Sequence, residues 1–224
     1  MGPMKLLTVN AGKARPVPYT DAPSGASGID KQPVDGRVRI AHPGPKGSAG
    51  GGVAGDAVCD LRFHGGPDRA AYAYAREDLD AWQRELGRDL ANGCFGENLT
   101  TAGVDVTHAL IGEHWRIGTT VLEVTGGRIP CRTFQGFLEE PGWVRRFTRA
   151  ARPGALLRVI EEGEVRADDP IEVVHRPDHD ITVHLLFRAA TLERELLPRT
   201  LVAAEWMESG FLETAREYVA KYGS

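Results

Sequence analysis

The sequence is poor in cysteine. Its three cysteines are Cys59, Cys94 and Cys131, and no two of them form a C-x-x-C pair. An odd number of widely separated cysteines argues against a disulfide scaffold, a zinc ribbon and an iron–sulfur cluster. Any redox function of this chain therefore requires electrons from elsewhere.

Long apolar runs and a strong excess of one charge are also absent. No run approaches the roughly 20 apolar residues of a membrane-spanning helix, and residues 1–10 lack the features of a secretion signal. The 27 basic and 31 acidic residues give a formal charge of −4 and a pI near 6.0. We therefore expect a cytoplasmic protein with no nucleic-acid polymer and no membrane among its partners.

The strand pattern is the main indication of fold class. The 224 residues, 42% of them apolar, can bury one sizeable core and leave room for a small appendage. Alternating apolar residues and turn signals predict strands at 5–10, 31–34, 37–40, 71–74, 114–117, 121–125, 155–160 and 171–175. Asp35-Gly36 predicts a hairpin between the second and third strands, and Gly118-Thr119 predicts another after residue 117. Many short strands favour a mainly β barrel or sandwich over a doubly wound sheet.

Helices are predicted mainly near the end of the chain. The spacing of Leu79, Trp82 and Leu86 indicates one internal helix over residues 76–86, and a short one is expected around Trp143. After Pro177 the helical spacing predicts helices at 182–190, 192–197 and 201–222. We therefore divide the chain into a mainly β domain, residues 1–177, and a small helical subdomain, residues 178–224.

Cys131 is the first candidate for chemistry. It lies between Arg128 and Arg132 in the segment T-G-G-R-I-P-C-R-T. Positive neighbours favour the thiolate, which is the form that attacks electrophiles or binds soft metals. Pro130 fixes its own backbone torsion, so the cysteine is expected on a defined turn. The alternative is a half-buried structural cysteine just beyond a strand.

A second group of candidates surrounds the Gly65-Gly66 turn. His64 precedes the two glycines, and Asp68 and Arg69 follow them. The glycines let the backbone approach a ligand and leave amide groups free to face an anion, while His64 and Arg69 add donors. The alternative for His64 is a structural residue at a turn.

Two further segments have two interpretations each. Glu97 and Asn98 present an acid and an amide beside Gly96, and they can also cap backbone groups at an ordinary strand-to-turn junction. Residues 44–55 are rich in glycine and are typical of a flexible surface loop. A phosphate-binding loop is the alternative there, although the G-x-x-x-x-G-K-[ST] motif does not occur.

Five short blocks occur in a fixed order along the chain. They are K-Q-P-V at 31–34, G-D at 55–56 with Asp60, H-G-G-P-D-R-A at 64–70, F-G-E-N-L at 95–99 and R-I-P-C at 128–131. Together they resemble the MOSC domain, named after the C-terminal part of molybdenum-cofactor sulfurase. The match covers almost the whole chain. The segment after Pro177 is similar to the three-helix extension of the compact bacterial branch of that family.

The resemblance implies a MOSC-type β-barrel core with peripheral helices that binds the molybdenum cofactor, Mo-molybdopterin. It implies that Cys131 is the protein ligand to the metal. It also implies reduction and detoxification of small N-hydroxylated compounds, such as hydroxylamino purine analogues, with an external protein electron donor. The cofactor-binding residues would be Lys31, His64, Gly65, Gly66, Arg69, Asn98, Arg128 and Cys131, and the catalytic residues would be Cys131, His64, Asp68 and Glu97.

Other functions stay open at this stage. A pterin dithiolene supplies two sulfurs, so one protein thiolate is sufficient, and the cations around Gly65-Gly66 suit its phosphate. Asp68 or Glu97 would either deliver protons or only orient His64 and Arg69. A non-catalytic carrier, holding sulfur as a persulfide on Cys131 or holding the cofactor, is one alternative. A metal-free transferase with Cys131 as nucleophile is another.

Overall fold

The structure, a computed structural model, describes residues 2–47 and 50–223. The strands within these residues are β1 (Lys5–Gly12), β2 (Arg15–Pro16), β3 (Ala26–Ser27), β4 (Lys31–Pro33), β5 (Val38–Ile40), β6 (Ala71–Ala75), β7 (Leu99–Ala102), β8 (His114–Ile117), β9 (Thr120–Gly126), β10 (Ala155–Glu161), β11 (Gly163–Val165) and β12 (Ile171–His175). The α-helices are α1 (Arg76–Leu86), α2 (Arg132–Leu138), α3 (Trp143–Ala150), α4 (Val183–Thr191), α5 (Leu197–Thr200) and α6 (Ser209–Tyr222). Short 3-10 helices are η1 (Pro67–Arg69), η2 (Arg194–Leu196) and η3 (Leu201–Ala203).

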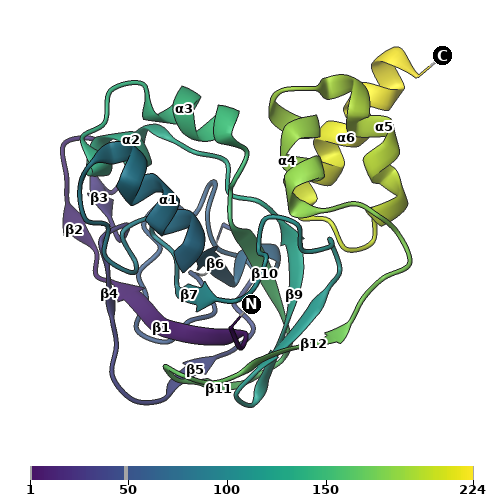
Figure 1. Ribbon diagram of the computed structural model, residues 1–224. Helices are drawn as coiled ribbons and strands as arrows, with labels where there is room; N and C mark the ends of the chain where they lie inside the picture. The colour runs from purple at the N-terminus through teal and green to yellow at the C-terminus, as the bar shows by residue number, and fades with distance from the viewer. Residues whose placement is uncertain (1, 48–49, 224) are drawn as a thin grey trace.

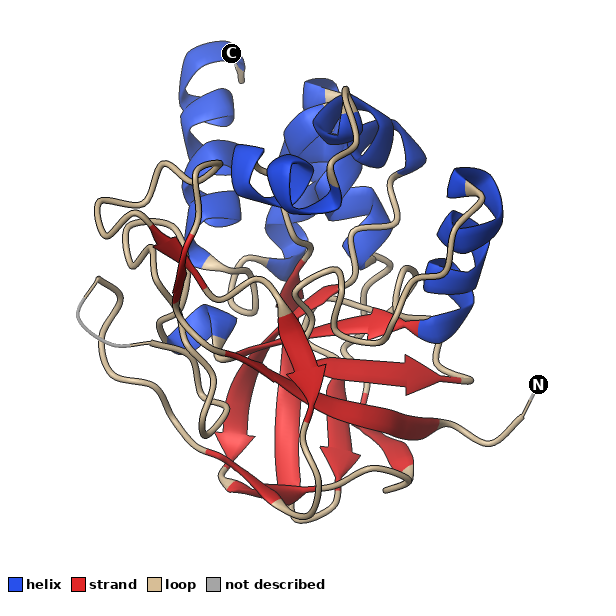
Figure 2. Ribbon diagram, turned by 90° about the vertical axis from the view of Figure 1, so that its left-hand side faces the viewer, coloured by secondary structure: helices blue, strands red, loops and turns tan. Residues whose placement is uncertain are grey.

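Eight strands form one curled sheet in the order β12-β8-β9-β10-β6-β7-β1-β4. All neighbours in it are antiparallel except β6 and β7, which are parallel. A backbone bridge between Lys5 and Pro170 brings β1 to the start of β12, so the two edges of the sheet approach each other. The result is a half-barrel beneath the helices (Figures 1 and 2). This confirms the mainly β, barrel-type architecture predicted from the sequence.

Helix α1 has the bounds that the sequence predicts. It buries Leu79 and Trp82 and ends at Gly87, whose φ of 68° lets its N–H reach the carbonyl of Gln83 at 2.9 Å. A residue with a Cβ would be strained in this left-handed conformation. The predicted hairpin of β8 and β9 is also confirmed, with Trp115 opposite Leu122.

An aromatic cluster holds α1, α2 and α3 against the sheet. Its rings belong to Trp82, Phe95, Phe134, Trp143 and Phe147, all fully buried, with neighbouring centroids 4.7 to 6.2 Å apart. Edge-on, tilted and offset-stacked aromatic pairs of this kind add to the energy of apolar burial. Because Phe95 precedes the G-E-N segment and Phe134 follows Cys131, the cluster fixes two of the five sequence blocks in space.

The hairpin predicted across Asp35-Gly36 is wrong. Both strands exist, but β4 pairs with β1 and β5 pairs with β11, which the sequence did not predict as a strand. Pro33 ends β4 and has no N–H to continue a ladder, and the chain then leaves the sheet. The local signal therefore located a bend, at Gly36 with a φ of 82°, and was misleading about the partner strands.

Three α-helices follow Pro177. Thr182 caps α4 by accepting from the N–H of Leu185 at 3.1 Å, as predicted, but the single helix expected over 201–222 is broken between η3 and α6. A small apolar cluster of Ala189, Leu197 and Ala215 lies within these helices, while Phe211 joins the main core. The division of the chain at residue 177 stays a prediction.

Candidate functional site

A cavity of about 460 Å³ lies where the five sequence blocks meet. Its wall comes from segments distant in sequence, within residues 20–31, 51–72, 96–98 and 128–133, and from Leu156. A volume of this size suits a cofactor or small-molecule ligand. Seven of the residues predicted for the site line it, namely Lys31, His64, Gly65, Arg69, Asn98, Arg128 and Cys131.

Cys131 is half-buried at the cavity and has an extended backbone directly before α2. Its two arginine neighbours have other partners. Arg132 is exposed and pairs with Asp21 at 2.7 Å, whereas the Arg128 guanidinium lies 4.2 Å from the ring centre of Phe134 and donates to the carbonyl of Phe95. Arg128 is thus fixed in the cavity wall, and Arg132 makes a solvent-screened contact at its edge.

Lys31 and Asp56 form a buried ion pair in the cavity wall. The Asp56 side chain is 3% exposed, and its carboxylate also accepts from the N–H of Gly12 at 2.8 Å and from Asn98 Nδ2 at 2.9 Å. Burial lowers the pKa of Lys31, and the neighbouring Asp56 opposes that effect. The Asn98 side chain in turn accepts from the N–H of Tyr72 at 3.2 Å, so the wall is cross-linked to β6.

His64 lies among the cations of the cavity. Burial and the positive charges of Arg128 and Arg69 lower its pKa from 6.5 to about 4. At neutral pH the imidazole is therefore uncharged and can both donate and accept a hydrogen bond. The same charges that keep His64 neutral make the cavity attractive to an anion.

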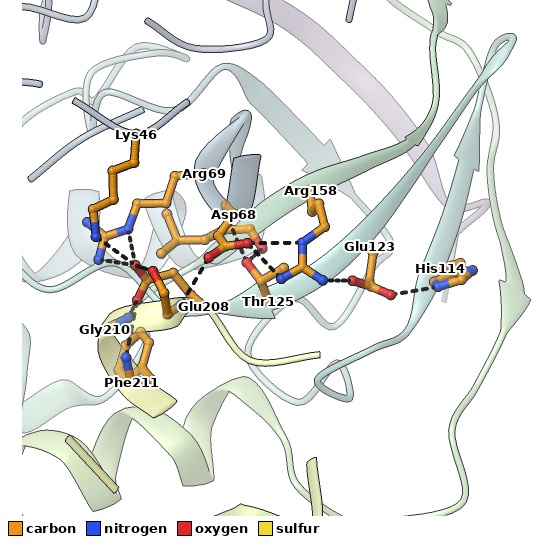
Figure 3. A network of polar contacts seen from close by, with 12 residues as sticks. Lys46, Asp68, Arg69, His114, Glu123, Thr125, Arg158, Glu208, Gly210 and Phe211 are labelled. Carbon is orange, nitrogen blue, oxygen red and sulfur yellow. Dashed lines mark hydrogen bonds and ion pairs between the residues drawn. The ribbon is translucent and has the colours of Figure 1, made fainter. Parts of the chain in front are cut away.

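Arg69, at the end of η1, lines the cavity, and two groups accept hydrogen bonds from its guanidinium. Its Nε donates to Glu208 Oε1 at 3.0 Å, and it also donates to the carbonyl of Phe63. Glu208 belongs to the helical segment after Pro177, called the helical tail below. Figure 3 shows the contact between Arg69 and Glu208. Gly66, directly before η1, has a φ of 82°, and a Cβ there would meet the Lys46 backbone at 3.0 Å. Gly66 thus contributes to the close packing behind the cavity and does not line it.

Glu97 and Asp68 were both predicted as catalytic, and neither lines the cavity. Glu97 is fully buried, and its carboxylate accepts from the N–H groups of Gly93 at 2.5 Å and Phe95 at 3.0 Å and from the Thr100 hydroxyl at 2.9 Å. Burial raises its pKa.

The partners of Asp68 also lie outside the cavity lining. The Asp68 carboxylate accepts from Arg158 at 2.7 Å and from the N–H of Ser209 at 3.0 Å, and hydrogen bonds from these two groups lower its pKa against the opposing effect of burial. Glu97 accepts from backbone groups, as in the capping alternative that the sequence left open, whereas Asp68 contacts Arg158 and Ser209. A catalytic role for either carboxylate stays a prediction.

Asp56, Tyr72 and Cys59 are among the lining residues that sequence reasoning did not assign to the site. Asp56 was noted within a sequence block, but its carboxylate was given no role. Tyr72 was read as part of a strand, and its ring lies 5.5 Å from the Arg128 guanidinium while its hydroxyl donates to the Pro153 carbonyl at 2.8 Å. Cys59 shares the cavity with Cys131, and burial raises the pKa of its thiol. Asp56 was the most accessible of the three to sequence reasoning, because it stands beside Gly55 in a block already singled out.

Within residues 2–47 and 50–223, no group of three or more His, Cys, Asp or Glu side chains is arranged to hold a metal ion. In the same residues, no helix combines the length and the apolar character needed to cross a membrane.

Comparison with known sequences identifies the family. The model of the MOSC domain matches residues 60–172. The chain is 31% identical over 183 residues to uncharacterized protein YflK of Bacillus subtilis (strain 168), a match that covers 82% of this chain and 79% of the relative. It is 32% identical over 160 residues to protein YiiM of Escherichia coli (strain K12), covering 70% and 67%. This chain belongs to the MOSC domain family.

A more distant relative and two crystal structures complete the comparison. A reductase of Gibberella moniliformis (strain M3125 / FGSC 7600) is 29% identical over 204 residues, which cover 86% of this chain but 36% of the relative. YiiM from Geobacillus stearothermophilus superposes with a TM-score of 0.78 at 23% identity, over 97% of this chain and 100% of the other. YiiM from Escherichia coli gives 0.71 at 25% identity, over 99% and 93%.

The Glu97 network gives a prediction about stability. Glu97→Ala leaves three buried donors unpaired and is expected to lower the free energy of unfolding by about 3 kcal/mol or more. Glu97→Gln keeps one acceptor oxygen and is expected to cost less. Urea denaturation followed by circular dichroism measures both variants, and an alanine variant as stable as the wild type would contradict the network.

The low pKa of His64 predicts a pH dependence. Because the unfolded chain binds a proton near pH 6.5 and the folded chain only near pH 4, stability falls as the pH drops between these values. The full effect is about 3 kcal/mol. His64→Gln is therefore expected to lose less stability than the wild type between pH 7 and pH 5 in urea denaturation. Equal losses in the two proteins would show that His64 is not held neutral.

Proposed function

We propose that this chain is a molybdenum-cofactor-dependent reductase of N-hydroxylated compounds, such as hydroxylamino purine analogues, with Cys131 as the protein ligand to molybdenum. One observation carries the proposal. A half-buried thiol and three basic side chains, those of Lys31, Arg69 and Arg128, line the same cavity of about 460 Å³. Membership of the MOSC family and the reductase among its relatives support it.

The donor set fits the cofactor. The pterin dithiolene brings two sulfurs of its own, so a single soft protein ligand is sufficient, and Cys131 provides one. The cofactor's phosphate requires cations and amide donors, which Lys31, Arg69 and Arg128 provide near the Gly65 backbone. When bound, the cofactor supplies the two-electron redox chemistry, and the protein supplies binding and orientation.

Each residue has a distinct part in this proposal. Arg128 is fixed by Phe95 and Phe134 and faces the anion with its charge. Lys31 is oriented by the buried Asp56. His64 is uncharged at neutral pH, so its imidazole can hold or pass a proton at a ring nitrogen without adding charge.

The exposed part of the cavity lining suits a planar substrate. Phe63 is 59% exposed and Ile129 is 44% exposed, and both line the cavity. Apolar and aromatic surface left in contact with water favours stacking of a heteroaromatic ring such as a purine. Reduction also needs an external protein electron donor, and the three free cysteines suit the reducing cytoplasm in which we place this activity.

Cofactor analysis tests the proposal. Protein made in a molybdenum-replete host is expected to hold molybdenum and pterin in near-stoichiometric amounts, measured by mass spectrometry and pterin fluorescence. Cys131→Ser is expected to lose molybdenum and keep its circular dichroism spectrum. Cys94→Ser is the matched control, because Cys94 is also half-buried but does not line the cavity.

Two outcomes would contradict the proposal. Full retention of molybdenum in Cys131→Ser would exclude ligation by that thiol. If the wild type binds molybdenum but reduces no N-hydroxylated substrate with an artificial electron donor, the carrier function replaces the reductase.

Phe63→Ala tests the substrate surface. Loss of one stacking contact is worth about 1 kcal/mol, so KM for a hydroxylamino purine is expected to rise roughly fivefold with little change in kcat. Val202→Ala is the control, because Val202 is 60% exposed and lies outside the cavity. An unchanged KM would exclude stacking on Phe63.

A further inference from the structure

The helical tail contributes a buried carboxylate directly behind the cavity. The Glu208 side chain is 1% exposed, and its Oε1 lies 3.0 Å from both Nε and Nη2 of Arg69 (Figure 3). Arg69 lines the cavity, whereas Glu208 does not. The two residues are 139 positions apart in the sequence. A two-nitrogen contact of this kind sets the orientation of the guanidinium plane as well as its position.

Glu208 is itself held in place by its other contacts. Its second carboxylate oxygen accepts from the N–H groups of Gly210 at 2.9 Å and Phe211 at 3.2 Å, at the start of α6. Its own N–H donates to the carbonyl of Thr125 at 2.9 Å, on β9 of the sheet. The start of α6 therefore holds the Glu208 carboxylate, and β9 holds the Glu208 backbone.

Arg69 keeps donors for a ligand in spite of these contacts. A guanidinium carries five N–H groups. Two of them face Glu208, and one on Nη1 donates to the Phe63 carbonyl. Among residues 2–47 and 50–223, no other partner takes the remaining N–H on each terminal nitrogen. Two such N–H groups can bind two oxygens of a phosphate.

Ser209, the residue after Glu208, makes a second contact between the helical tail and η1. The N–H of Ser209 donates to Asp68 Oδ2 at 3.0 Å, and Asp68 is fixed in turn by Arg158 of β10 at 2.7 Å. Two consecutive residues of the tail thus contact two consecutive residues of η1. The exposed Lys46 approaches Glu208 only at 3.7 Å and adds little.

We propose that Glu208 is a positioning residue, which orients the Arg69 guanidinium so that its free edge binds the phosphate of an anionic ligand in the cavity. The helical tail is then a part of the binding site through this contact. The inference rests on the proposed function for the identity of the ligand, but an oriented Arg69 would bind any phosphate monoester.

The test compares affinity for inorganic phosphate, measured by isothermal titration calorimetry on the full chain at about 0.15 M salt, where long-range charge effects are screened. Glu208→Gln removes the negative charge and one of the two acceptor oxygens. If Glu208 orients Arg69, affinity is expected to fall roughly tenfold. If Glu208 only neutralises Arg69, its removal raises the positive potential and phosphate binds more tightly. Unchanged or tighter binding would overturn the proposal.

A double-mutant cycle separates positioning from a general structural effect. Arg69→Gln is expected to weaken phosphate binding at least as much as Glu208→Gln, and the double variant is expected to be no weaker than Arg69→Gln alone. Additive losses would show that Glu208 acts independently of Arg69. Asp180→Asn is the matched control in the tail, because Asp180 forms an exposed ion pair with Arg199, and wild-type affinity is expected.

A second variant covers the case in which Glu208→Gln does not fold. Arg69→Lys keeps the charge and leaves Glu208 intact, but it loses the planar group that Glu208 orients. A roughly tenfold loss of phosphate affinity is expected, and wild-type affinity would overturn the proposal. Because phosphate binding needs no molybdenum, a failure of molybdenum ligation in Cys131→Ser can be told apart from a failure of this inference.

Discussion

The buried carboxylate of Asp56 is the constraint on which the cavity wall depends. It accepts from Lys31 on β4, from the backbone of Gly12 on β1 and from Asn98 just before β7. A carboxylate that is 3% exposed is costly unless it is paired and fully hydrogen-bonded, so these three segments are held in one arrangement. The edge of the sheet and the cavity wall are therefore specified by the same group.

The cations of the cavity are balanced to different degrees. Lys31 is paired with Asp56, and Arg69 is paired with Glu208. Among the described residues, Arg128 has no carboxylate partner, and it contacts a carbonyl and two aromatic rings. The two paired cations, Lys31 and Arg69, therefore contribute mainly hydrogen-bond donors in fixed positions. Arg128 contributes the net positive charge of the cavity. This agrees with its place directly after burial among the causes that lower the pKa of His64.

Sequence reasoning was accurate where the signal is local and failed where it depends on partners. The bounds of α1 follow from apolar spacing and from Gly87, and the β8–β9 hairpin follows from its turn. The partners of β4 and β5 come from strands far along the chain, so a turn at Asp35-Gly36 could not identify them. The five sequence blocks located the cavity. The contact between Arg69 and Glu208, 139 residues later, corresponds to no local sequence pattern and could not be predicted.

The surroundings of Cys131 show why neighbours in sequence are a poor guide to electrostatics. Arg128 and Arg132 flank the thiol along the chain, yet one stacks within the cavity wall and the other pairs with Asp21 at the surface. The arginine that matters most to the site electrostatically is the one that is held by aromatic rings. An anion bound beside Arg128 and Arg69 would offset the charges that keep the His64 pKa low. Occupancy of the cavity and protonation of His64 are therefore linked, with each favouring the other.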